Sequence, residues 1–458
     1  MKFAVVGGGL AGLMAARSLN VAYPNSDITL IERSQALGGL LAGIQYDEPD
    51  AYFDKGTHIF RETGHSEIDE FILNSIPSKE LIHFEVDQGD LSGAVFEGRL
   101  QTNTHFPDIR HRADYKELVK ALRYRTDSAA PIPTVKRLEP FLSNACDRFG
   151  DLYTKRVLAP ILSSLYQRPA KDLASFALLL PGLTRVVGMD YADWLAISDC
   201  NQYREIFAVP DQRQLPNSFR HGKRSFYSRK QGSRRFIKGI ANVLKASGVN
   251  ILRGTTITAL DLNQLILICL NQIGETLKLQ VDGLVIATGV IGAAHLLKIN
   301  LAQFDFDTPL LNRIVNLILK DPVDSNLCYF YGLDPKVDFY RVTNYRGFSD
   351  NFQDRRISIE VLGRADIDDR LLPRYLIGQL CKTAFLPNDQ FSFCDTVRLD
   401  TGFPAPTVQN MQSLTRLSEY IERLLPNRVI CGGIGTHQGL FFQNEILENL
   451  YKRTSQLI

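Results

Sequence analysis

The chain has 458 residues, and its 45% hydrophobic and 10% aromatic content is enough for a large buried core, which excludes a disordered or fibrous protein. The 52 Lys and Arg residues nearly balance the 50 Asp and Glu residues, so the net charge of +2 excludes the overall basic field of a nucleic-acid-binding protein. Seven cysteines without a C-x-x-C pair, and eight histidines without metal-ligand spacing, argue against a disulfide scaffold or a metal site and are typical of a cytoplasmic protein.

The first 32 residues predict a strand, a glycine turn, a helix and a second strand. The apolar runs Phe3–Val6 and Ile28–Ile31 are typical of buried parallel strands. Between them, residues 7–12 satisfy G-x-G-x-x-G and are followed by apolar residues at helical spacing. Glu32 stands at the end of the second strand. This order of parts predicts a dinucleotide-binding unit.

Each part of this unit has a role in holding a dinucleotide. Gly7 permits the tight turn, Gly9 lets the backbone approach a pyrophosphate, and Gly12 allows the helix to pack closely on the strand. The helix N-terminus adds unpaired N–H groups and a partial positive charge. A carboxylate at the end of the second strand can accept hydrogen bonds from ribose hydroxyls. The residues predicted to bind the cofactor here are Gly7, Gly9, Leu10, Ala11, Gly12 and Glu32.

A second glycine turn, Gly38–Gly43, follows soon after the acidic strand end. This succession resembles the FAD-dependent flavoprotein superfamily that contains amine oxidases, protoporphyrinogen oxidases and UDP-galactopyranose mutases. Leu40 replaces the Arg common in amine oxidases, which makes that subgroup less favoured. The alternative to a cofactor contact is a surface loop. The resemblance implies that FAD is the cofactor and that its diphosphate and ribityl chain lie along Arg33, Gly38, Gly39 and Leu40.

The segment Phe53–Phe60 resembles the G-x-H-I-F segment of the mutases and a looser version in the oxidases. The resemblance implies that Thr57 and His58 pass beside the flavin ring. His58 then hydrogen-bonds a flavin edge or a substrate, and its titration near neutrality suits proton transfer. The alternative is a buried histidine whose ring is satisfied by the backbone.

Residues 236–289 predict a helix over 236–246, short strands, a meander and a final apolar strand. Here the resemblance implies that the backbone near Ile257 meets the adenine, and that Ala287 and Thr288 lie near FAD. A third glycine turn, residues 432–439, follows the apolar strand Val429–Cys431.

The third glycine turn precedes a helix predicted over 440–450, which in the superfamily points at the pyrimidine side of the flavin ring. Such a helix end would stabilise negative charge there. Ile434 replaces the Arg of the mutases' G-R-L-G-T turn, which weakens a close correspondence. The residues that the resemblance assigns to FAD here are Gly433, Gly435, Thr436 and Gly439, with His437 as a catalytic candidate.

Between Gln212 and Lys238 the chain carries nine Lys or Arg residues and no acid, interleaved with Phe and Tyr. Such a run offers donors to an acidic or diphosphate-bearing substrate, or it is a solvated face. The preceding segment predicts helices over 115–124 and 149–165, and Gln167 stands where mutase-like relatives often have Gly.

Residues 300–395 alternate apolar and polar positions, which indicates sheet. Phe339–Tyr345 resembles a substrate-domain strand in which the mutases place an arginine near the sugar diphosphate. Arg341 and Tyr345 are therefore candidate catalytic or substrate residues. The alternative is a strand whose Arg pairs with an acid.

The fold expected is α/β: a discontinuous, three-layer Rossmann-like FAD-binding domain with an α+β substrate domain. The FAD-binding domain is expected over 1–78, 226–299 and 396–458. The substrate domain is expected over 79–225, as its helical part, and 300–395, as its sheet part.

Three functions are compatible with these motifs. The first is an FAD-dependent oxidoreductase, resembling protoporphyrinogen oxidases and amine oxidases, that transfers hydride from a small molecule to flavin N5. The second is a non-redox nucleotide-sugar mutase of surface polysaccharide synthesis, and the third is a non-catalytic flavin-binding partner protein. The expected partner is a small-molecule substrate, anionic or a nucleotide sugar in the mutase hypothesis, and not nucleic acid. No transmembrane segment is expected, peripheral membrane contact stays open, and the sequence does not determine the oligomeric state.

Overall fold

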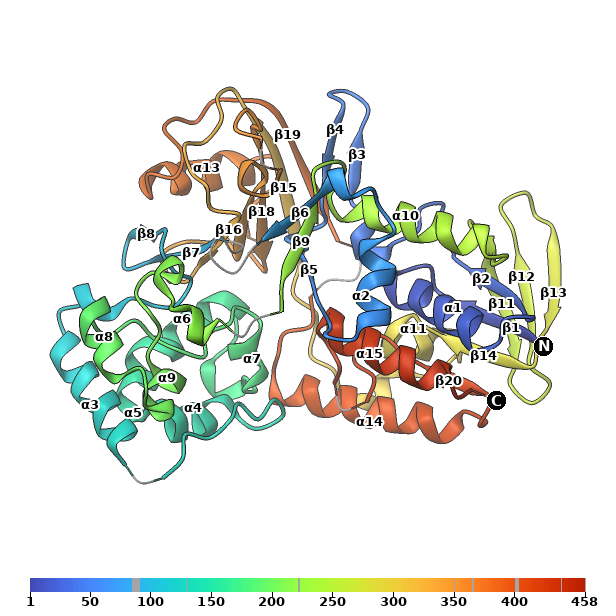
Figure 1. The fold of residues 1–458 in the computed structure, drawn as a ribbon, viewed down its shortest axis with the longest axis horizontal. Coiled ribbons are helices and arrows are strands. Elements are labelled where there is room, and N and C mark those ends of the chain that lie inside the picture. The colour runs from blue at the N-terminus through green and yellow to red at the C-terminus, as the bar shows by residue number, and fades with distance from the viewer. Residues whose placement is uncertain are drawn as a thin grey trace. The chain divides into compact units, whose positions relative to one another are not determined.

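The computed structural model describes residues 1–84, 91–128, 130–220, 223–349, 351–364, 366–399, 403–437 and 439–457. The chain divides into two compact units (Figure 1). Unit 1 comprises Met1–His83, Lys223–Phe306 and Gln412–Ile458, and unit 2 comprises Phe84–Gly222 and Asp307–Met411.

Unit 1 is built on a five-stranded parallel sheet in the order β10-β2-β1-β14-β20. Its strands are short and apolar, as expected for strands buried on both faces. Their bounds are β1 Lys2–Val6, β2 Asp27–Ile31, β10 Asn250–Leu252, β14 Gly283–Ile286 and β20 Val429–Cys431.

Two sets of elements cover this sheet and give three layers. One face packs against helices α1 (Leu10–Ala22), α10 (Gly232–Ala246) and α15 (Gln443–Thr454). The other face packs against α11 (Gly289–Leu296), α14 (Val408–Leu424) and a meander. The meander strands are β11 Thr256–Asp261, β12 Ile266–Leu270 and β13 Thr276–Gln280. The expectation of a three-layer, Rossmann-like α/β arrangement is confirmed.

Smaller elements complete unit 1. Helix α2 spans Ser66–Leu73. The remaining strands are β3 Ile44–Tyr46, β4 Ala51–Phe53, β5 Phe60–Arg61, β6 Leu81–Phe84 and β9 Ser225–Ser228, with β3 paired to β4 and β9 between β5 and β6.

Unit 2 combines a helical part with a seven-stranded sheet in the order β19-β15-β18-β17-β16-β7-β8. The strands are β7 Ser92–Phe96, β8 Arg99–Gln101, β15 Asn312–Leu319, β16 Tyr329–Gly332, β17 Arg341–Asn344, β18 Arg356–Leu362 and β19 Phe391–Arg398. Helix α13 (Leu372–Lys382) packs its Leu376, Ile377 and Leu380 on one sheet face, and a second core lies among the helices.

Besides α13, the described part of unit 2 contains the helices α3 Tyr115–Asp127, α4 Phe141–Phe149, α5 Asp151–Tyr153, α6 Ala159–Tyr166, α7 Phe176–Leu179, α8 Tyr191–Ile197, α9 Asn201–Ile206 and α12 Tyr345–Ser349. The helix expected over 149–165 is observed as consecutive helical elements over 151–166, which include a π-helical stretch, Thr154–Leu158. One expectation about these elements was wrong. The strand expected to include Tyr345 ends at Asn344, because Tyr345 begins α12.

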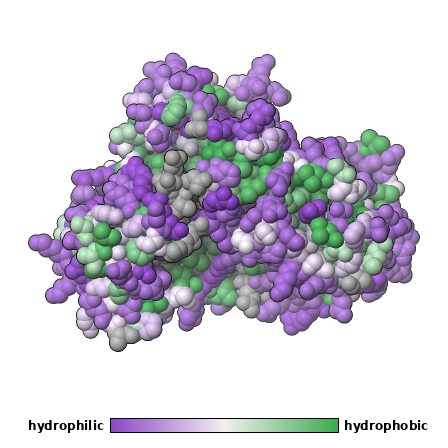
Figure 2. Space-filling model, in the orientation of Figure 1, coloured by the Kyte–Doolittle hydropathy of each residue, from purple (hydrophilic) through white to green (hydrophobic). Residues whose placement is uncertain are grey.

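Hydrophilic residues cover most of the face shown in Figure 2, with smaller hydrophobic areas between them. Among the described residues, no helix combines the length and hydropathy that crossing a membrane requires. Within the same residues, no group of three or more His, Cys, Asp or Glu side chains could hold a metal ion.

Candidate functional site

The carboxyl ends of four neighbouring parallel strands meet at one edge of the unit 1 sheet. Val6 of β1 is paired with Ile31 of β2 and with Ile286 of β14, and Ile286 is paired with Cys431 of β20. The segments that follow these strands therefore leave the sheet side by side. The segments after β1, β2 and β20 contain the three glycine turns, and the segment after β14 contains Ala287 and Thr288. In open α/β sheets, ligands bind outside this edge.

The first glycine turn joins β1 to α1 at this edge. The Gly7 N–H donates to the Ile31 carbonyl at 2.9 Å, and a Cβ atom on Gly12 would lie only 1.8 Å from the Gly7 carbonyl oxygen. A Cβ atom on Gly9, the N-cap of α1, would meet nothing within 4 Å. Helix α1 also lacks a side-chain cap and an acidic residue in its first turn. The turn therefore leaves open space beside an uncapped helix N-terminus, which favours an anion.

The carboxylate of Glu32 lies against the same turn. Its Oε2 accepts from the Gly8 N–H at 2.6 Å, and its Oε1 accepts from the Ser34 N–H at 2.7 Å. Each oxygen keeps a second lone pair for a ribose hydroxyl. The Thr255 N–H donates to the Glu32 carbonyl at 3.0 Å, which brings the start of β11, and Ile257 on it, toward this end of the sheet.

The second glycine turn rests directly on the first. The Gly38 N–H donates to the Gly8 carbonyl at 2.8 Å, and Gly9 and Gly38 form an isolated parallel bridge. A Cβ atom on Gly39 would have only the Gly9 Cα within 4 Å. Arg33 is exposed, and the Leu40 side chain is 44% exposed. The two turns thus form a continuous backbone surface with room for a ligand beside it.

The third glycine turn meets the segment after β14. The Gly432 N–H donates to the Ile286 carbonyl at 2.9 Å, and the Gly289 N–H donates to the Gly432 carbonyl at 3.1 Å. A Cβ atom on Gly433 would lie 2.8 Å from the Gly289 nitrogen. Ala287 hydrogen-bonds Val6 through its N–H at 2.8 Å, so the turns after β1, β14 and β20 are linked in series.

Within the third turn the predicted residues differ in their surroundings. The Thr436 hydroxyl is buried and donates to the Gly433 carbonyl at 2.8 Å, and Gly435 and Gly439 are also buried. Thr288 is exposed, and the Ile434 side chain is 45% exposed. The helix expected from Leu440 starts later, at Gln443, and the Glu445 carboxylate accepts from the Phe442 N–H at 3.3 Å. Because that carboxylate already lies at the α15 N-terminus, the positive helix end is partly neutralised.

His58 and Thr57 lie in the loop between β4 and β5. The His58 Nε2 is 3.0 Å from the Lys55 carbonyl oxygen, and the ring is half-buried. Thr57 is buried. The geometry shows a backbone partner for His58, and its role beside a flavin stays a prediction.

His437 lies among charged side chains of two helices. Its ring is in contact with the Arg453 guanidinium of α15, and its Nε2 is 3.5 Å from the Glu422 carboxylate of α14. Arg453 also donates to the Cys431 carbonyl at 2.7 Å. Burial, together with the positive charge of Arg453, lowers the pKa of His437 below its ordinary value. A neutral imidazole at neutral pH follows from this environment.

Arg341 and Tyr345 lie in unit 2. The Arg341 guanidinium makes two hydrogen bonds to the Glu360 carboxylate, at 2.7 and 2.9 Å, from the neighbouring strand. Burial disfavours its charge, but Glu360, together with Tyr331 and Tyr340, outweighs this and holds the pKa of Arg341 well above its usual range. The Tyr345 ring is 1% exposed, with its hydroxyl 3.3 Å from the Ser358 hydroxyl.

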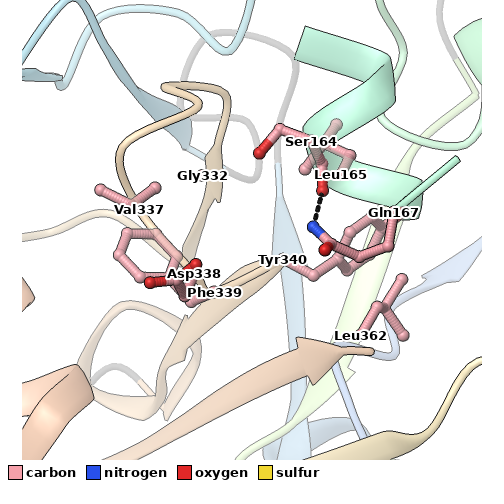
Figure 3. A pocket seen from close by; sticks show the side chains of 9 residues that line it. All are labelled: Ser164, Leu165, Gln167, Gly332, Val337, Asp338, Phe339, Tyr340 and Leu362. Atoms are coloured by element: carbon pink, nitrogen blue, oxygen red, sulfur yellow. Dashed lines mark hydrogen bonds between the residues drawn. The ribbon is translucent and has the colours of Figure 1, made fainter. Parts of the chain in front are cut away.

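A pocket in unit 2 lies between the end of α6 and strands β16–β18 (Figure 3). Gln167, Tyr340 and Leu362 are among its lining residues, and it holds about 10 Å³ of space for a water-sized sphere. That volume suits one water molecule rather than a substrate. Gln167 ends α6 with a left-handed φ of 47°, a conformation that glycine adopts more readily than other residues.

The basic run between Gln212 and Lys238 is divided between the two units and is partly neutralised. Arg213 pairs with Asp211, Arg224 with Glu62 and Arg235 with Glu80, each within 2.6 Å. Burial raises the pKa of Glu62, but its hydrogen bonds with Arg224 more than reverse this and hold it below the ordinary range. Because these three arginines are already paired with carboxylates, we interpret them as part of a solvated protein surface rather than as a binding site for an anionic substrate.

One buried group was missed by the sequence reasoning. Asp54, beside the predicted His58 segment, is 1% exposed and has hydroxyl partners from other segments. The only sequence signal was an acidic residue directly after an apolar strand. Besides Tyr52, two residues earlier, its partners lie at residues 227 and 233, too far along the chain for a local pattern to reveal.

Residues 5–72 match the family described as NAD(P)-binding Rossmann-like domain. A curated protoporphyrinogen oxidase of Schizosaccharomyces pombe is 23% identical over 274 residues, which cover 54% of this chain and 54% of that protein. The chain therefore spans about half the length of that relative.

Solved structures match the whole chain. A reduced UDP-galactopyranose mutase superposes with a TM-score of 0.72 at 13% identity, covering 100% of this chain and 95% of that one. A cyclohexylamine oxidase from Brevibacterium oxydans superposes with a TM-score of 0.59 at 13% identity, covering 100% and 98%. The chain has the fold of the FAD-dependent flavoprotein superfamily. The match over residues 5–72 includes the first two glycine turns and Glu32.

The edge of the sheet that carries these turns fits a flavin dinucleotide by its own geometry. A long, narrow ligand needs backbone without side chains along its path, and positions 9 and 39 provide it. A diphosphate needs N–H donors, and the uncapped start of α1 provides them. Glu32 provides the acceptor for a ribose.

Proposed function

We propose that the protein is an FAD-dependent oxidoreductase that removes hydride from a small molecule. The observation that carries this proposal is the meeting of three glycine turns and Glu32 at one edge of a parallel sheet. FAD, when bound, supplies the hydride acceptor. The chain's part is to bind and orient it.

Each turn would hold a different part of FAD. Glu32 would accept the ribose hydroxyls, and the N–H groups of Leu10 and Ala11 at the start of α1 would bind the diphosphate. Because Gly39 has no side chain, it would leave room for the ribityl chain of FAD. The backbone around Thr288 and Gly433 would approach the ring end.

Two observations support a redox reaction over sugar isomerisation. The sequence similarity is to a protoporphyrinogen oxidase. In addition, Arg341, the residue expected to clamp a sugar diphosphate, is held by both oxygens of Glu360. An arginine neutralised in this way attracts a dianion weakly.

The test begins with the absorption spectrum of purified protein and the flavin released on denaturation. We expect a yellow protein that releases FAD, and a colourless protein that does not take up FAD would contradict the proposal. The oxidised holoprotein is then mixed anaerobically with amines and with a porphyrinogen. Bleaching of the flavin band by one class identifies the hydride donor.

A flavin-dependent nucleotide-sugar mutase is the second candidate, because the mutase fold covers the whole chain with a TM-score of 0.72. It is distinguished by incubating dithionite-reduced holoprotein with UDP-galactopyranose. Isomerisation without net oxidation would favour the mutase, and an unchanged sugar would favour the oxidoreductase. A cytoplasmic location and a small-molecule partner complete the proposal.

A further inference from the structure

Asp54 is a buried carboxylate that joins three segments of unit 1. It follows β4 directly and is 1% exposed. It accepts from the Tyr52 hydroxyl at 2.6 Å, from the Tyr227 hydroxyl of β9, and from both the N–H, at 3.2 Å, and the hydroxyl of Ser233. Four hydrogen-bond donors from three side chains and one backbone N–H group thus converge on this buried carboxylate.

Helix α10 depends on this carboxylate because it has no cap of its own. The side chain of its N-cap, Gln231, accepts from the Lys238 ammonium group and makes no capping hydrogen bond to the helix backbone, and the first turn holds Arg234 and Arg235 but no acid. Positive side chains at a helix N-terminus are unfavourable. Asp54 supplies the missing anion and acceptor from another segment. A Cβ atom on Gly232 would lie 2.8 Å from the Asp54 Oδ2, so only glycine permits this approach.

The same end of α10 supports the second glycine turn. The Ser233 hydroxyl lies 3.3 Å from the Leu41 carbonyl oxygen as well as against Asp54. A Cβ atom on Gly38 would lie 3.1 Å from the Ile237 Cγ1. The turn 38–43 therefore sits between the first glycine turn on one side and the start of α10 on the other.

We propose that Asp54 is a positioning residue that fixes the glycine turn 38–43 through Ser233 and α10. The Asp54 side chain has no need to touch FAD. By holding the start of α10 in place, it keeps the turn at the spacing that the cofactor requires. The effect on the cofactor rests on the proposed function, whereas the effect on the turn does not.

The test uses the holoprotein and the Asp54→Asn variant, which keeps the size of the side chain but replaces one acceptor oxygen by a donor. We expect FAD to be released about tenfold faster than from the wild type, because hydrogen bonds to a charged acceptor are lost. Release is followed by the rise of flavin fluorescence after dilution. We also expect faster amide hydrogen exchange in a peptide covering residues 38–43.

Asp69→Asn is the matched control. Asp69 is also buried and multiply hydrogen-bonded in unit 1, but its bonds run to Thr63 and Gly64, at 2.7 and 2.9 Å, away from the turn. We expect it to lower the melting temperature without faster exchange at 38–43. Ser233→Ala should act like Asp54→Asn but more mildly, and the double variant should be no worse than Asp54→Asn alone.

Two outcomes would overturn the proposal. The first is that Asp54→Asn and Asp69→Asn release FAD and exchange amide hydrogens at residues 38–43 equally fast for an equal loss of melting temperature. In that case general destabilisation, and not the position of Asp54, explains the effect. The other is unchanged exchange at 38–43 in Asp54→Asn. If the wild-type protein carries no FAD, the proposed function fails, and the exchange measurement by itself then decides whether Asp54 holds the turn.

Discussion

A Cβ atom on Gly12 would lie 1.8 Å from the carbonyl oxygen of Gly7, far inside van der Waals contact. A Cβ atom on Gly9, in the same motif, would have no heavy atom within 4 Å. The two glycines therefore serve different purposes. Gly12 lets α1 pack against the turn, and Gly9 leaves open space beside it.

Alanine at these two positions should separate folding from cofactor binding. Gly12→Ala must push α1 away from the turn, so we expect a large loss of stability and little soluble protein. Gly9→Ala should leave the melting temperature of the flavin-free protein nearly unchanged while reducing FAD uptake by at least about tenfold. Thermal unfolding and flavin content of both variants check this. Normal FAD uptake by Gly9→Ala would contradict a cofactor path beside this residue.

Glu32→Gln tests the other end of the same site. The amide group would place a donor against either the Gly8 or the Ser34 N–H, which now donate at 2.6 and 2.7 Å. We expect FAD affinity to fall about tenfold or more, since a ribose acceptor and a loop contact are both weakened. Titration of FAD into flavin-free protein measures it. Asp282→Asn, at the exposed start of the sheet, is the control and should bind FAD like the wild type.

The three glycine turns and the strands before them could be predicted well because their sequence signals are local. Apolar runs such as Phe3–Val6 form strands wherever both sheet faces are covered, and β1 is observed at Lys2–Val6. The helix expected from Phe236 is part of α10, which starts four residues earlier, at Gly232. Parallel pairing then brings the strand ends together without further information.

Features that depend on distant partners could not be predicted. Arg341 has its partner nineteen residues away on β18, and Asp54 has partners more than 170 residues away. Tyr345 directly follows strand β17, yet it begins the short helix α12, and its side chain is buried. In each case tertiary packing, which the local pattern does not contain, decides the outcome.

The Arg341–Glu360 pair should matter more for stability than for substrate binding. Its side chains are only 18% and 10% exposed, so Arg341→Met leaves a buried carboxylate without its partner and should cost about 3 kcal/mol. Arg341→Met combined with Glu360→Leu should recover part of this loss. Arg398→Met removes an exposed ion pair with Asp369 and should lower the stability far less than Arg341→Met does. Urea unfolding measures all three, and a tenfold weaker UDP-galactose affinity in Arg341→Met at unchanged stability would instead support the mutase.

His437 should make the stability of unit 1 sensitive to mild acid. Burial and the charge of Arg453 lower its pKa from the ordinary 6.5, against the weaker opposite effect of Glu422. The unfolded chain therefore binds a proton more readily than the folded one, and stability falls as the pH drops below about 6.5. His437→Asn removes this titration, and Asn tolerates the left-handed φ of 43° at this position. We expect the difference in melting temperature between pH 7.5 and pH 5.5 to be smaller in His437→Asn than in the wild type, and an equal difference would show that other groups control it.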